Sequence, residues 1–371
     1  MTKYQICKRC IMDTTDSEIV FDKNGLCNHC KTAEKIGDKI WKPNEEGQNI
    51  LQNIINKVRE DGKNKKYDAI IGLSGGVDSS YLAYIAAKYW NLRLLAVHVD
   101  GGWNIKMAEN NVRSICEEYK IDLEVIKIDW EAMRKLQIAF LRAAVPNQDI
   151  PQDHAFFATL YSFAVKNNIK YVLNGSNWAT ECILPKSWGY NAMDAKHIID
   201  IYNKHGEGRL ENFPLIDFYK VKIYYPYIKG MKILKLLNLI PYSKESAINE
   251  LEENTGWRYY GGKHYESIWT RFMQSYYLPN KFNIDKRRAH LSSLIMSKEI
   301  TREMALEQMK EPLYNQEDIL ALKEIISDKL QISVKEFNEL IEKPTNKHEN
   351  YYCTSKELKY KLLMKINDLR K

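Results

Sequence analysis

One stretch of sequence decides how this chain is expected to fold: Tyr67-Asp68-Ala69-Ile70-Ile71-Gly72-Leu73-Ser74-Gly75-Gly76-Val77-Asp78-Ser79-Ser80. Residues 67–73 form a short apolar run, which is typical of a buried β-strand. A helical pattern follows over residues 80–87, so the glycine-rich segment between them lies at a strand-to-helix junction. This order predicts the first β-α unit of a parallel sheet.

The same alternation continues downstream. We expect further strands over residues 93–99, 123–128 and 170–173, and helices over 106–119 and 154–166. Short apolar strands that alternate with helices predict an α/β fold with a doubly wound parallel sheet. Such sheets bind ligands beyond the carboxyl ends of their strands, which selects residues 74–79, 98–104 and 174–178 as the floor of one site.

The glycine-rich segment has the composition of a phosphate-binding loop. Adjacent Gly75 and Gly76 allow consecutive N–H groups to converge on an anion, and the helix that follows adds its positive dipole end. Asp78 would be repelled by phosphate unless a divalent cation lay between them, so it implies Mg2+. The loop lacks the Gly-Lys-Ser/Thr ending of a Walker motif, which disfavours γ-phosphoryl transfer. The alternative is a plain glycine-rich turn with a capping serine.

Four of the seven cysteines lie in the first 30 residues, as Cys7-x2-Cys10 and Cys27-x2-Cys30. Their spacing is typical of a zinc ribbon, in which four thiolates leave no open coordination position. We therefore expect a structural Zn2+. An iron–sulfur cluster and a redox-active dithiol are the alternatives, and the redox reading is disfavoured because neither pair is expected to open a helix after a strand.

Length and composition favour several domains and exclude disorder. The 371 residues include 55 basic and 48 acidic side chains, a net charge of +7 that leaves nucleotides, sugar nucleotides and RNA open as partners. We expect a ribbon and linker over residues 1–45, a nucleotide-binding domain over 46–230, and a helical region over 231–371, with helices at 231–239, 243–254 and 265–277. No apolar run approaches a membrane span or a signal-peptide core, so a cytoplasmic location is expected.

Several segments resemble a known family. The Ser74–Ser79 loop resembles the signature of the PP-loop ATP pyrophosphatases, and the resemblance continues through residues 98–104, 173–178, 261–267 and 282–291. With the four-cysteine ribbon, the chain is similar, to about residue 310, to the N-acetyl sugar amidotransferases of bacterial surface-polysaccharide and flagellar-sugar pathways, including lipopolysaccharide O-antigen synthesis.

The resemblance implies a reaction and a set of residues. An acetamido oxygen of a sugar acid or sugar nucleotide would attack the α-phosphate of ATP, pyrophosphate would leave, and ammonia would then displace AMP to give an acetamidino sugar. The residues expected to bind ATP are Ser74, Gly75, Gly76, Val77, Asp78, Ser79, His98, Val99, Asp100, Gly175 and Asn177. The catalytic candidates are Asp78, Lys263, His264, Glu266, Arg271, Lys286 and Arg287, although the charged residues beyond Asp78 could equally be a solvated helix start. Glu266 and Thr270 are expected on one helical face.

The chain shows no recognisable ammonia source of its own. Position 2 is Thr2 rather than a nucleophilic cysteine, and neither Cys116 nor Cys182 has a glycine-flanked setting. The resemblance therefore implies a separate glutaminase with a cyclase-like partner. The runner-up is a PP-loop tRNA-thiolating enzyme, and the third reading is a nucleotide-binding module without activity. Nucleic acid is not an expected partner, because no basic–aromatic tract stands out.

Overall fold

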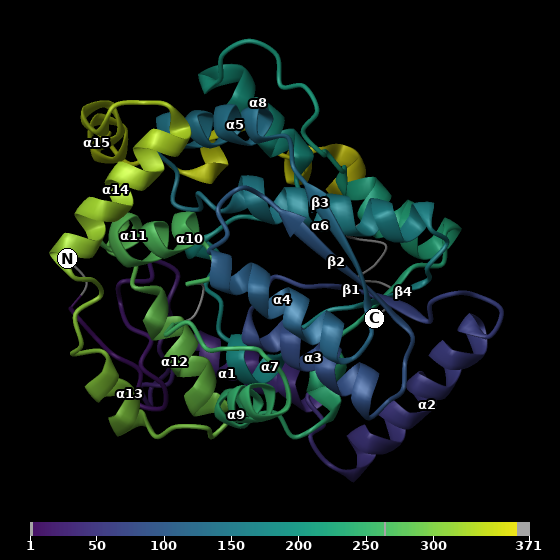
Figure 1. Cartoon of the computed structure of the whole chain (residues 1–371). Helices are drawn as coiled ribbons and strands as arrows, with labels where there is room; N and C mark the ends of the chain where they lie inside the picture. The colour runs from purple at the N-terminus through teal and green to yellow at the C-terminus, as the bar shows by residue number, and fades with distance from the viewer. Residues whose placement is uncertain (1–2, 263–264, 362–371) are drawn as a thin grey trace.

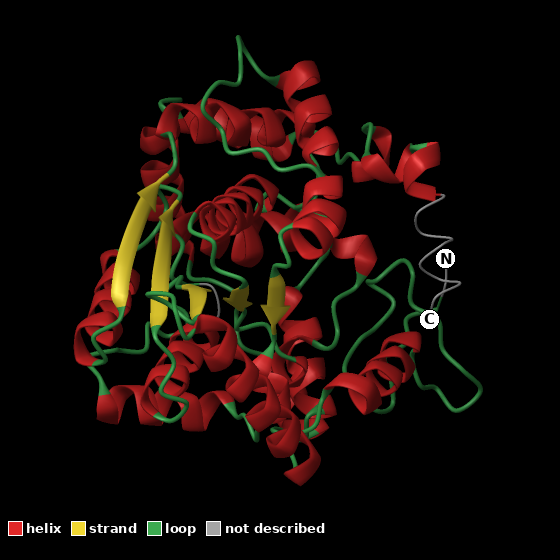
Figure 2. Ribbon diagram, turned by 90° about the vertical axis from the view of Figure 1, so that its right-hand side faces the viewer, coloured by secondary structure: helices red, strands yellow, loops and turns green. Residues whose placement is uncertain are grey.

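The computed structural model describes residues 3–262 and 265–361, and its centre is a five-stranded parallel sheet (Figures 1 and 2). The strands lie in the order β3-β2-β1-β4-β5. Their bounds are β1 Ala69–Gly72, β2 Leu94–Asp100, β3 Asp122–Lys127, β4 Tyr171–Leu173 and β5 Lys232–Leu234. The chain runs outward from β1 to β3 and then returns to β4 and β5. The order therefore reverses between β1 and β4, which is the switch point where such sheets bind ligands.

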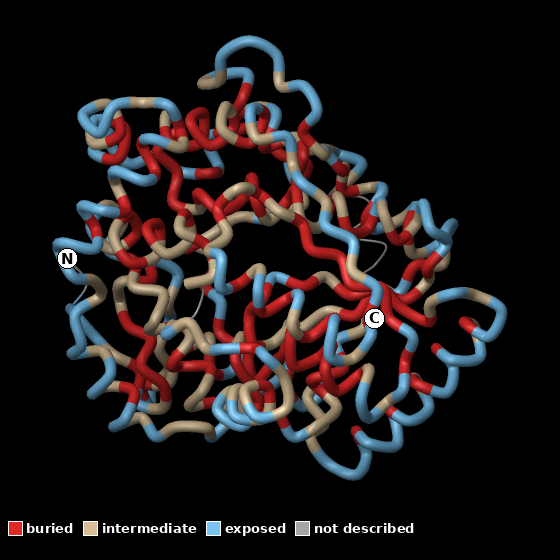
Figure 3. The backbone as a smooth tube through the Cα atoms, viewed as in Figure 1, coloured by how far each residue is buried: buried red, intermediate tan, exposed pale blue. Residues whose placement is uncertain are grey.

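Helices cover both faces of the sheet. The described α-helices are α1 Asn28–Ile40, α2 Glu45–Gly62, α3 Val77–Lys88, α4 Lys106–Glu118, α5 Trp130–Ala143, α6 Ile150–Lys166, α7 Trp178–Glu181, α8 Ala195–His205, α9 Lys244–Asn254, α10 Ile268–Phe272, α11 Leu278–Phe282, α12 Lys286–Met296, α13 Arg302–Gln308, α14 Gln316–Leu330 and α15 Val334–Glu342. Ile71 packs with residues of α3 and α4, whereas Ile70 packs with residues of α6. This alternation along β1 buries both of its faces (Figure 3) and confirms the expected α/β class.

Three local expectations are wrong. Residues 231–239 do not form a helix, because β5 and a short 3-10 turn at Leu236–Leu239 occupy this segment and β5 pairs with β4. The helix expected from residue 265 begins at Ile268, with Ser267 as its N-cap, so Glu266 lies in the preceding loop and does not share a helical face with Thr270. Helix α5 was not anticipated. The sheet thus extends past residue 230, while the division into three domains remains a prediction.

The cysteine-bearing N-terminus packs against helices from the far end of the sequence. The backbone N–H of Ile11 donates to Oγ of Ser292 on α12 at 3.2 Å, and Arg288 on the same helix lies 3.2 Å from the carboxylate of Asp13. These contacts join the first 30 residues to the C-terminal helical region. Within the described residues, none of the helices combines the length and the apolar character that crossing a membrane requires.

Candidate active site and metal centre

The backbone of the glycine-rich loop is fixed between two neighbouring segments. Gly75 has a φ of +85°, a conformation that residues with a side chain rarely adopt. A Cβ atom at this position would lie 2.4 Å from the carbonyl oxygen of Ala108 on α4. On the other side, the indole N–H of Trp257 donates to the carbonyl oxygen of Gly75 at 3.0 Å. Only glycine fits here, so Gly75 shapes the loop without lining the cavity.

The loop presents the N-terminus of α3 to open space. Gly76 is the N-cap of this helix and has no side chain to occupy the first free N–H groups. Oγ of Ser74 accepts the N–H of Gly76 at 3.2 Å and lies 3.3 Å from Oγ of Ser79. Two hydroxyl groups and a helix N-terminus therefore face the same region, which is the donor arrangement that a polyphosphate requires.

Asp78 is held by two donors from outside the loop. The hydroxyl group of Tyr242 donates to Oδ1 of Asp78, and Nδ2 of Asn177 donates to the same oxygen at 3.2 Å. Burial and the neighbouring carboxylate of Asp78 raise the pKa of Tyr242 well above its usual value, so the phenol stays protonated and remains a donor. A carboxylate on a phosphate loop suits a magnesium ion that bridges it to phosphate oxygens.

A cavity of about 270 Å³ opens in front of this loop. Most of the residues expected to bind ATP line it, and two catalytic candidates, Asp78 and Glu266, are among the lining residues: Ser74, Gly76, Val77, Asp78, Ser79, His98, Val99, Gly175 and Glu266. A Cβ atom on Gly76 would lie 3.3 Å from the Tyr260 hydroxyl group and 3.5 Å from Oε1 of Glu266, so these groups converge on the loop. Burial and Glu266 raise the pKa of Tyr260.

Asp100 and Asn177, which were expected to bind ATP, do not line the cavity, whereas His98 does. Oδ1 of Asp100 accepts the N–H of Gly102 at 2.8 Å and shapes the turn after β2. Asn177 reaches the site only through Asp78. His98 is buried with Nδ1 2.7 Å from the carbonyl oxygen of Leu73 and Nε2 3.1 Å from the Asn104 amide nitrogen. A carbonyl group only accepts, so Nδ1 of His98 donates to Leu73, and the ring forms part of the cavity wall.

The positively charged catalytic candidates Arg271, Lys286 and Arg287 do not line the cavity. Arg271 pairs with Asp318 at 3.1 Å, and Arg287 pairs with Asp285 at 2.8 Å while donating to the Glu311 carbonyl oxygen. Neither guanidinium group lines the cavity, because carboxylates on adjacent loops and helices engage both. Lys286 does not line it either. Lys263 and His264 lie outside the described residues.

The cavity wall also contains residues that the sequence reading did not select. They are Phe156, Phe157, Leu160, Thr180, Glu181, Lys244, Tyr260 and His290, in addition to Tyr242 behind Asp78. The aromatic pair at 156–157 and Leu160 give one side of the cavity an apolar wall that suits a nucleobase. His290 lies within residues 282–291, one of the segments that carried the family resemblance, and Tyr260 directly precedes Gly261 and Gly262. Position in or beside these segments was the only sequence evidence for a role of either residue in the site.

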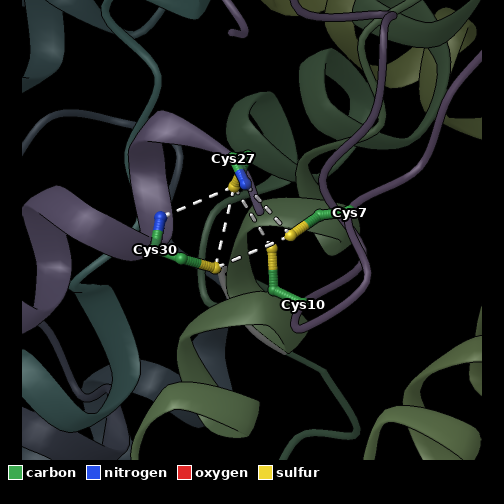
Figure 4. Close-up of side chains that lie close together, drawn as sticks. All are labelled: Cys7, Cys10, Cys27 and Cys30. Atoms are coloured by element: carbon green, nitrogen blue, oxygen red, sulfur yellow. Dashed lines mark hydrogen bonds between the residues drawn. The ribbon is translucent and has the colours of Figure 1, made fainter. Parts of the chain in front are cut away.

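The four N-terminal cysteines converge on one buried point (Figure 4). Their Sγ atoms all lie within 4.8 Å of one another, and those of Cys7 and Cys30, Cys10 and Cys27, and Cys27 and Cys30 are 3.8, 3.7 and 3.7 Å apart. A tetrahedral ion with metal–sulfur bonds of about 2.3 Å places its sulfur ligands roughly 3.8 Å apart. The donor set therefore fits a single four-coordinate ion.

Cys27 is the N-cap of α1 and Cys30 lies in its first turn, so the second pair opens a helix, but an isolated bridge between Phe21 and Cys27 rather than a strand precedes it. The convergence of all four sulfurs nevertheless favours metal binding over an isolated dithiol. His29 pairs with Asp16 at 2.5 Å, which leaves the four thiols as the ligand set.

Two family models match different parts of the chain. Residues 44–144 match the PP-loop domain, and residues 266–367 match the domain described as LPS biosynthesis protein WbpG-like, C-terminal domain. The switch-point loop and the first match define an ATP-utilising PP-loop protein. The two matches together place the chain in the WbpG-like family of PP-loop proteins, which confirms the family that the sequence resembled.

Individual relatives are more distant. A probable sulfurtransferase from Methanocaldococcus jannaschii is 30% identical over 55% of this chain and 60% of its own length. The GMP synthase of Pyrobaculum aerophilum is 26% identical over 44% of this chain and 30% of its own length. The chain thus spans less than two thirds of either relative.

Among solved structures, the NH3-dependent NAD synthetase of Campylobacter jejuni is 18% identical with a TM-score of 0.31, covering 73% of this chain and 99% of that one. The tRNA thiolase NcsA of Methanococcus maripaludis, solved with a 4Fe–4S cluster, is 17% identical with a TM-score of 0.35, covering 84% and 90%.

Proposed function

We propose that this protein is an ATP-dependent amidotransferase that converts the acetamido group of a sugar acid or sugar nucleotide into an acetamidino group. The product would serve surface-polysaccharide or flagellin-glycan synthesis. The observation that carries the proposal is the composition of one cavity. Ser74, Asp78 and Ser79 of the PP-loop line it, and so do Glu266 and His290 of the WbpG-like region.

The chemistry follows from the loop. An amide oxygen is a poor leaving group, so the acetamido oxygen first attacks the α-phosphorus of ATP and the bond to pyrophosphate breaks. Ammonia then adds to the activated carbon, loses a proton, and expels AMP. Ser74, Ser79 and the N-terminus of α3 would bind the β- and γ-phosphates, and Asp78 would hold Mg2+, which neutralises charge on the departing pyrophosphate. Tyr242 and Asn177 orient Asp78 for this task.

Ammonia would come from a separate glutaminase and its cyclase-like partner. Cys116 and Cys182 do not offer a glutaminase nucleophile. Burial raises the pKa of Cys116 to about 12 and that of Cys182 to about 11, so both thiols stay protonated near neutral pH. We propose zinc for the four-cysteine site, where the ion would hold the ribbon together.

Product analysis tests the reaction. Purified protein with ATP, Mg2+, an N-acetylated sugar acid or its nucleotide, and ammonium salt should form AMP and pyrophosphate in amounts equal to the acetamidino sugar. Glutamine should not replace ammonium until the partner pair is added. ADP and orthophosphate as primary products would exclude the proposed adenylation, and glutamine-dependent turnover by this chain alone would exclude the partner requirement.

A second candidate function is tRNA thiolation, which the 30% identity to a probable sulfurtransferase favours. Sulfur transfer through cysteine requires an accessible thiolate, and the raised pKa values of Cys116 and Cys182 argue against it. Incorporation of labelled sulfur into tRNA in an ATP-dependent assay would support this candidate over the first.

A further inference from the structure

A second group of polar side chains lies beside the nucleotide cavity, on α6. Asp149 is the N-cap of this helix, and Gln152 and Asp153 follow in its first turn. The hydroxyl group of Thr270, on α10, donates to Oδ1 of Asp149 at 3.0 Å. Nε2 of Gln152 lies 3.4 Å from the same hydroxyl oxygen. Asp149, Gln152 and Thr270 are thus connected by hydrogen bonds, and Asp153 is an electrostatic neighbour of Asp149. We name these four side chains the α6 cluster.

The α6 cluster adjoins the cavity. Asp153, Phe156, Phe157 and Leu160 recur at helical spacing along one face of α6, and the last three line the cavity. A Cβ atom on Gly101, at the end of β2, would lie 3.1 Å from the Phe156 ring and 3.5 Å from Oε1 of Gln152. The carbonyl oxygen of Gln152 therefore lies close to Phe156, which is part of the cavity wall.

Gln152 has an acceptor atom that the folded chain does not use. Its side chain is 2% exposed, and Oε1 has no hydrogen-bond partner among the described residues. A buried acceptor without a donor destabilises a protein, so such an atom in a cluster beside a cavity points to a donor that arrives with a ligand.

The charges of the α6 cluster narrow the ligand class. Burial and the nearby carboxylate of Asp149 raise the pKa of Asp153, and the positive charge of Lys286 opposes this shift. Two carboxyl groups and an unused carbonyl oxygen accept hydrogen bonds, whereas Lys286 alone supplies positive charge. Such a site accepts O–H and N–H groups and repels a further carboxylate.

We propose that the α6 cluster is the acceptor subsite, which binds the hydroxyl and amide N–H groups of the sugar next to the nucleotide. This inference rests on the proposed function and adds the part of the substrate that is recognised. If the sugar carries a carboxylate, that group lies away from the α6 cluster.

Two variants and one control test the proposal on the full chain. Gln152→Leu removes the unused acceptor at similar volume, Asp153→Asn removes one charge, and Glu124→Gln changes an exposed carboxylate on β3. Binding of α,β-methylene-ATP with Mg2+ is measured by calorimetry. Binding of UDP-N-acetylglucosamine, UDP-N-acetylmannosaminuronic acid and N-acetylneuraminic acid is then measured on the nucleotide-loaded protein.

Both cluster variants should weaken sugar binding about 10-fold or more, because Gln152→Leu removes an acceptor and Asp153→Asn replaces one acceptor oxygen with an amide donor. Nucleotide affinity should stay within about twofold of the wild type, since the cluster lies outside the phosphate loop. The melting temperature of Gln152→Leu should equal or exceed that of the wild type, because an unpaired buried acceptor is removed. A purely structural glutamine would instead lower it. Glu124→Gln should match the wild type throughout.

Three results would overturn the inference. Sugar binding could be unchanged in both variants, Gln152→Leu could lose thermal stability and nucleotide affinity together, or Asp153→Asn could abolish binding of Mg2+ alone without affecting sugar. Failure of the proposed function has a different signature, in which the wild type binds the nucleotide but none of the amide-bearing sugars.

Discussion

The guanidinium group of Arg302 donates hydrogen bonds to the backbone carbonyl oxygens of both Cys7 and Cys10. Nη2 lies 3.0 Å from the Cys7 oxygen, and Nε lies 3.1 Å from the Cys10 oxygen. Arg302 is the first residue of α13, so these hydrogen bonds join the first cysteine pair to the C-terminal helices. Four thiolates around a divalent ion carry a net charge of −2, which a neighbouring arginine stabilises.

Metal content is the first prediction. Elemental analysis should find one tightly bound zinc per chain, and Cys7→Ser should lower both zinc content and melting temperature, because the closed site holds the ribbon together. Nucleotide affinity should fall as a secondary effect, since α12 contacts the ribbon and also carries His290 of the cavity. Iron in place of zinc, with visible charge-transfer absorption, would contradict the assignment.

Arg302→Lys should lower the free energy of unfolding by about 1–3 kcal/mol while the protein keeps its zinc. Lysine preserves the charge but cannot donate to two carbonyl oxygens in the fixed geometry of a guanidinium group. Urea denaturation and metal analysis measure the two effects separately. The exposed Arg113→Lys is the control. Equal stability of the two variants would show that the Arg302 contacts are dispensable.

Asp78→Asn should abolish most pyrophosphate release, because an amide binds Mg2+ much less well than a carboxylate. Tyr242→Phe should act more gently and raise the Mg2+ concentration for half-maximal rate by roughly 3- to 10-fold, since Asp78 loses one of its two described donors. Tyr81→Phe is a matched control, because its ring packs 5.6 Å from that of Tyr242 while its hydroxyl group contacts Glu250. An unchanged Mg2+ requirement in Tyr242→Phe would remove Tyr242 from this role.

Gly75→Ala should remove nucleotide binding without unfolding the protein. The new methyl group would collide with the Ala108 carbonyl oxygen, and the positive φ would disfavour alanine, so the loop must move away from its phosphate-binding shape. Gly208→Ala is the control, because Gly208 has a φ of +68° with nothing near its Cβ position. Calorimetric titration with an ATP analogue distinguishes the two, and equal affinities would contradict the prediction.

Stability should fall as the pH falls from about 6.5 towards 4. Burial lowers the pKa of His154 and His197 to about 4 and that of His348 to about 3. Between these values and the ordinary histidine pKa, the unfolded chain binds protons that the folded chain does not. Each histidine therefore removes roughly 1.4 kcal/mol per pH unit in this window, and none of this loss occurs above it. Urea denaturation across the window measures the slope, which His348→Gln should reduce.

The central sheet could be predicted because each strand from β1 to β4 combines an apolar run with a clear turn or helix after it. β5 could not, because Lys232 and Leu234 belong to a short run that suits either a helix or an edge strand. Only pairing with β4 decides between them, and pairing depends on tertiary structure.

Some residues of the candidate site could likewise be predicted from the sequence, and others could not. Residues 74–79 are contiguous in sequence and share one local geometry, so their motif sufficed. Arg271 and Arg287 were plausible ligands until their pairing with Asp318 and Asp285 was visible. Tyr242, Gln152 and His290 are single residues on separate elements, and the sequence contains no local pattern that joins them to the loop.

The attachment of Ile11 to Ser292, and of the first cysteine pair to Arg302, has a consequence for how the protein is made. Ribosomes complete the two cysteine pairs roughly 270 residues before they complete α12 and α13, the helices that contact this segment. A nascent chain can therefore acquire its metal early while Ile11 and Met12, both fully buried in the finished protein, still lack their cover. Helix α12 can pack against this surface only after it has been made, and the same helix carries His290 of the cavity. Synthesis that stops before α12 would leave a metal-loaded but aggregation-prone intermediate with an unfinished active site.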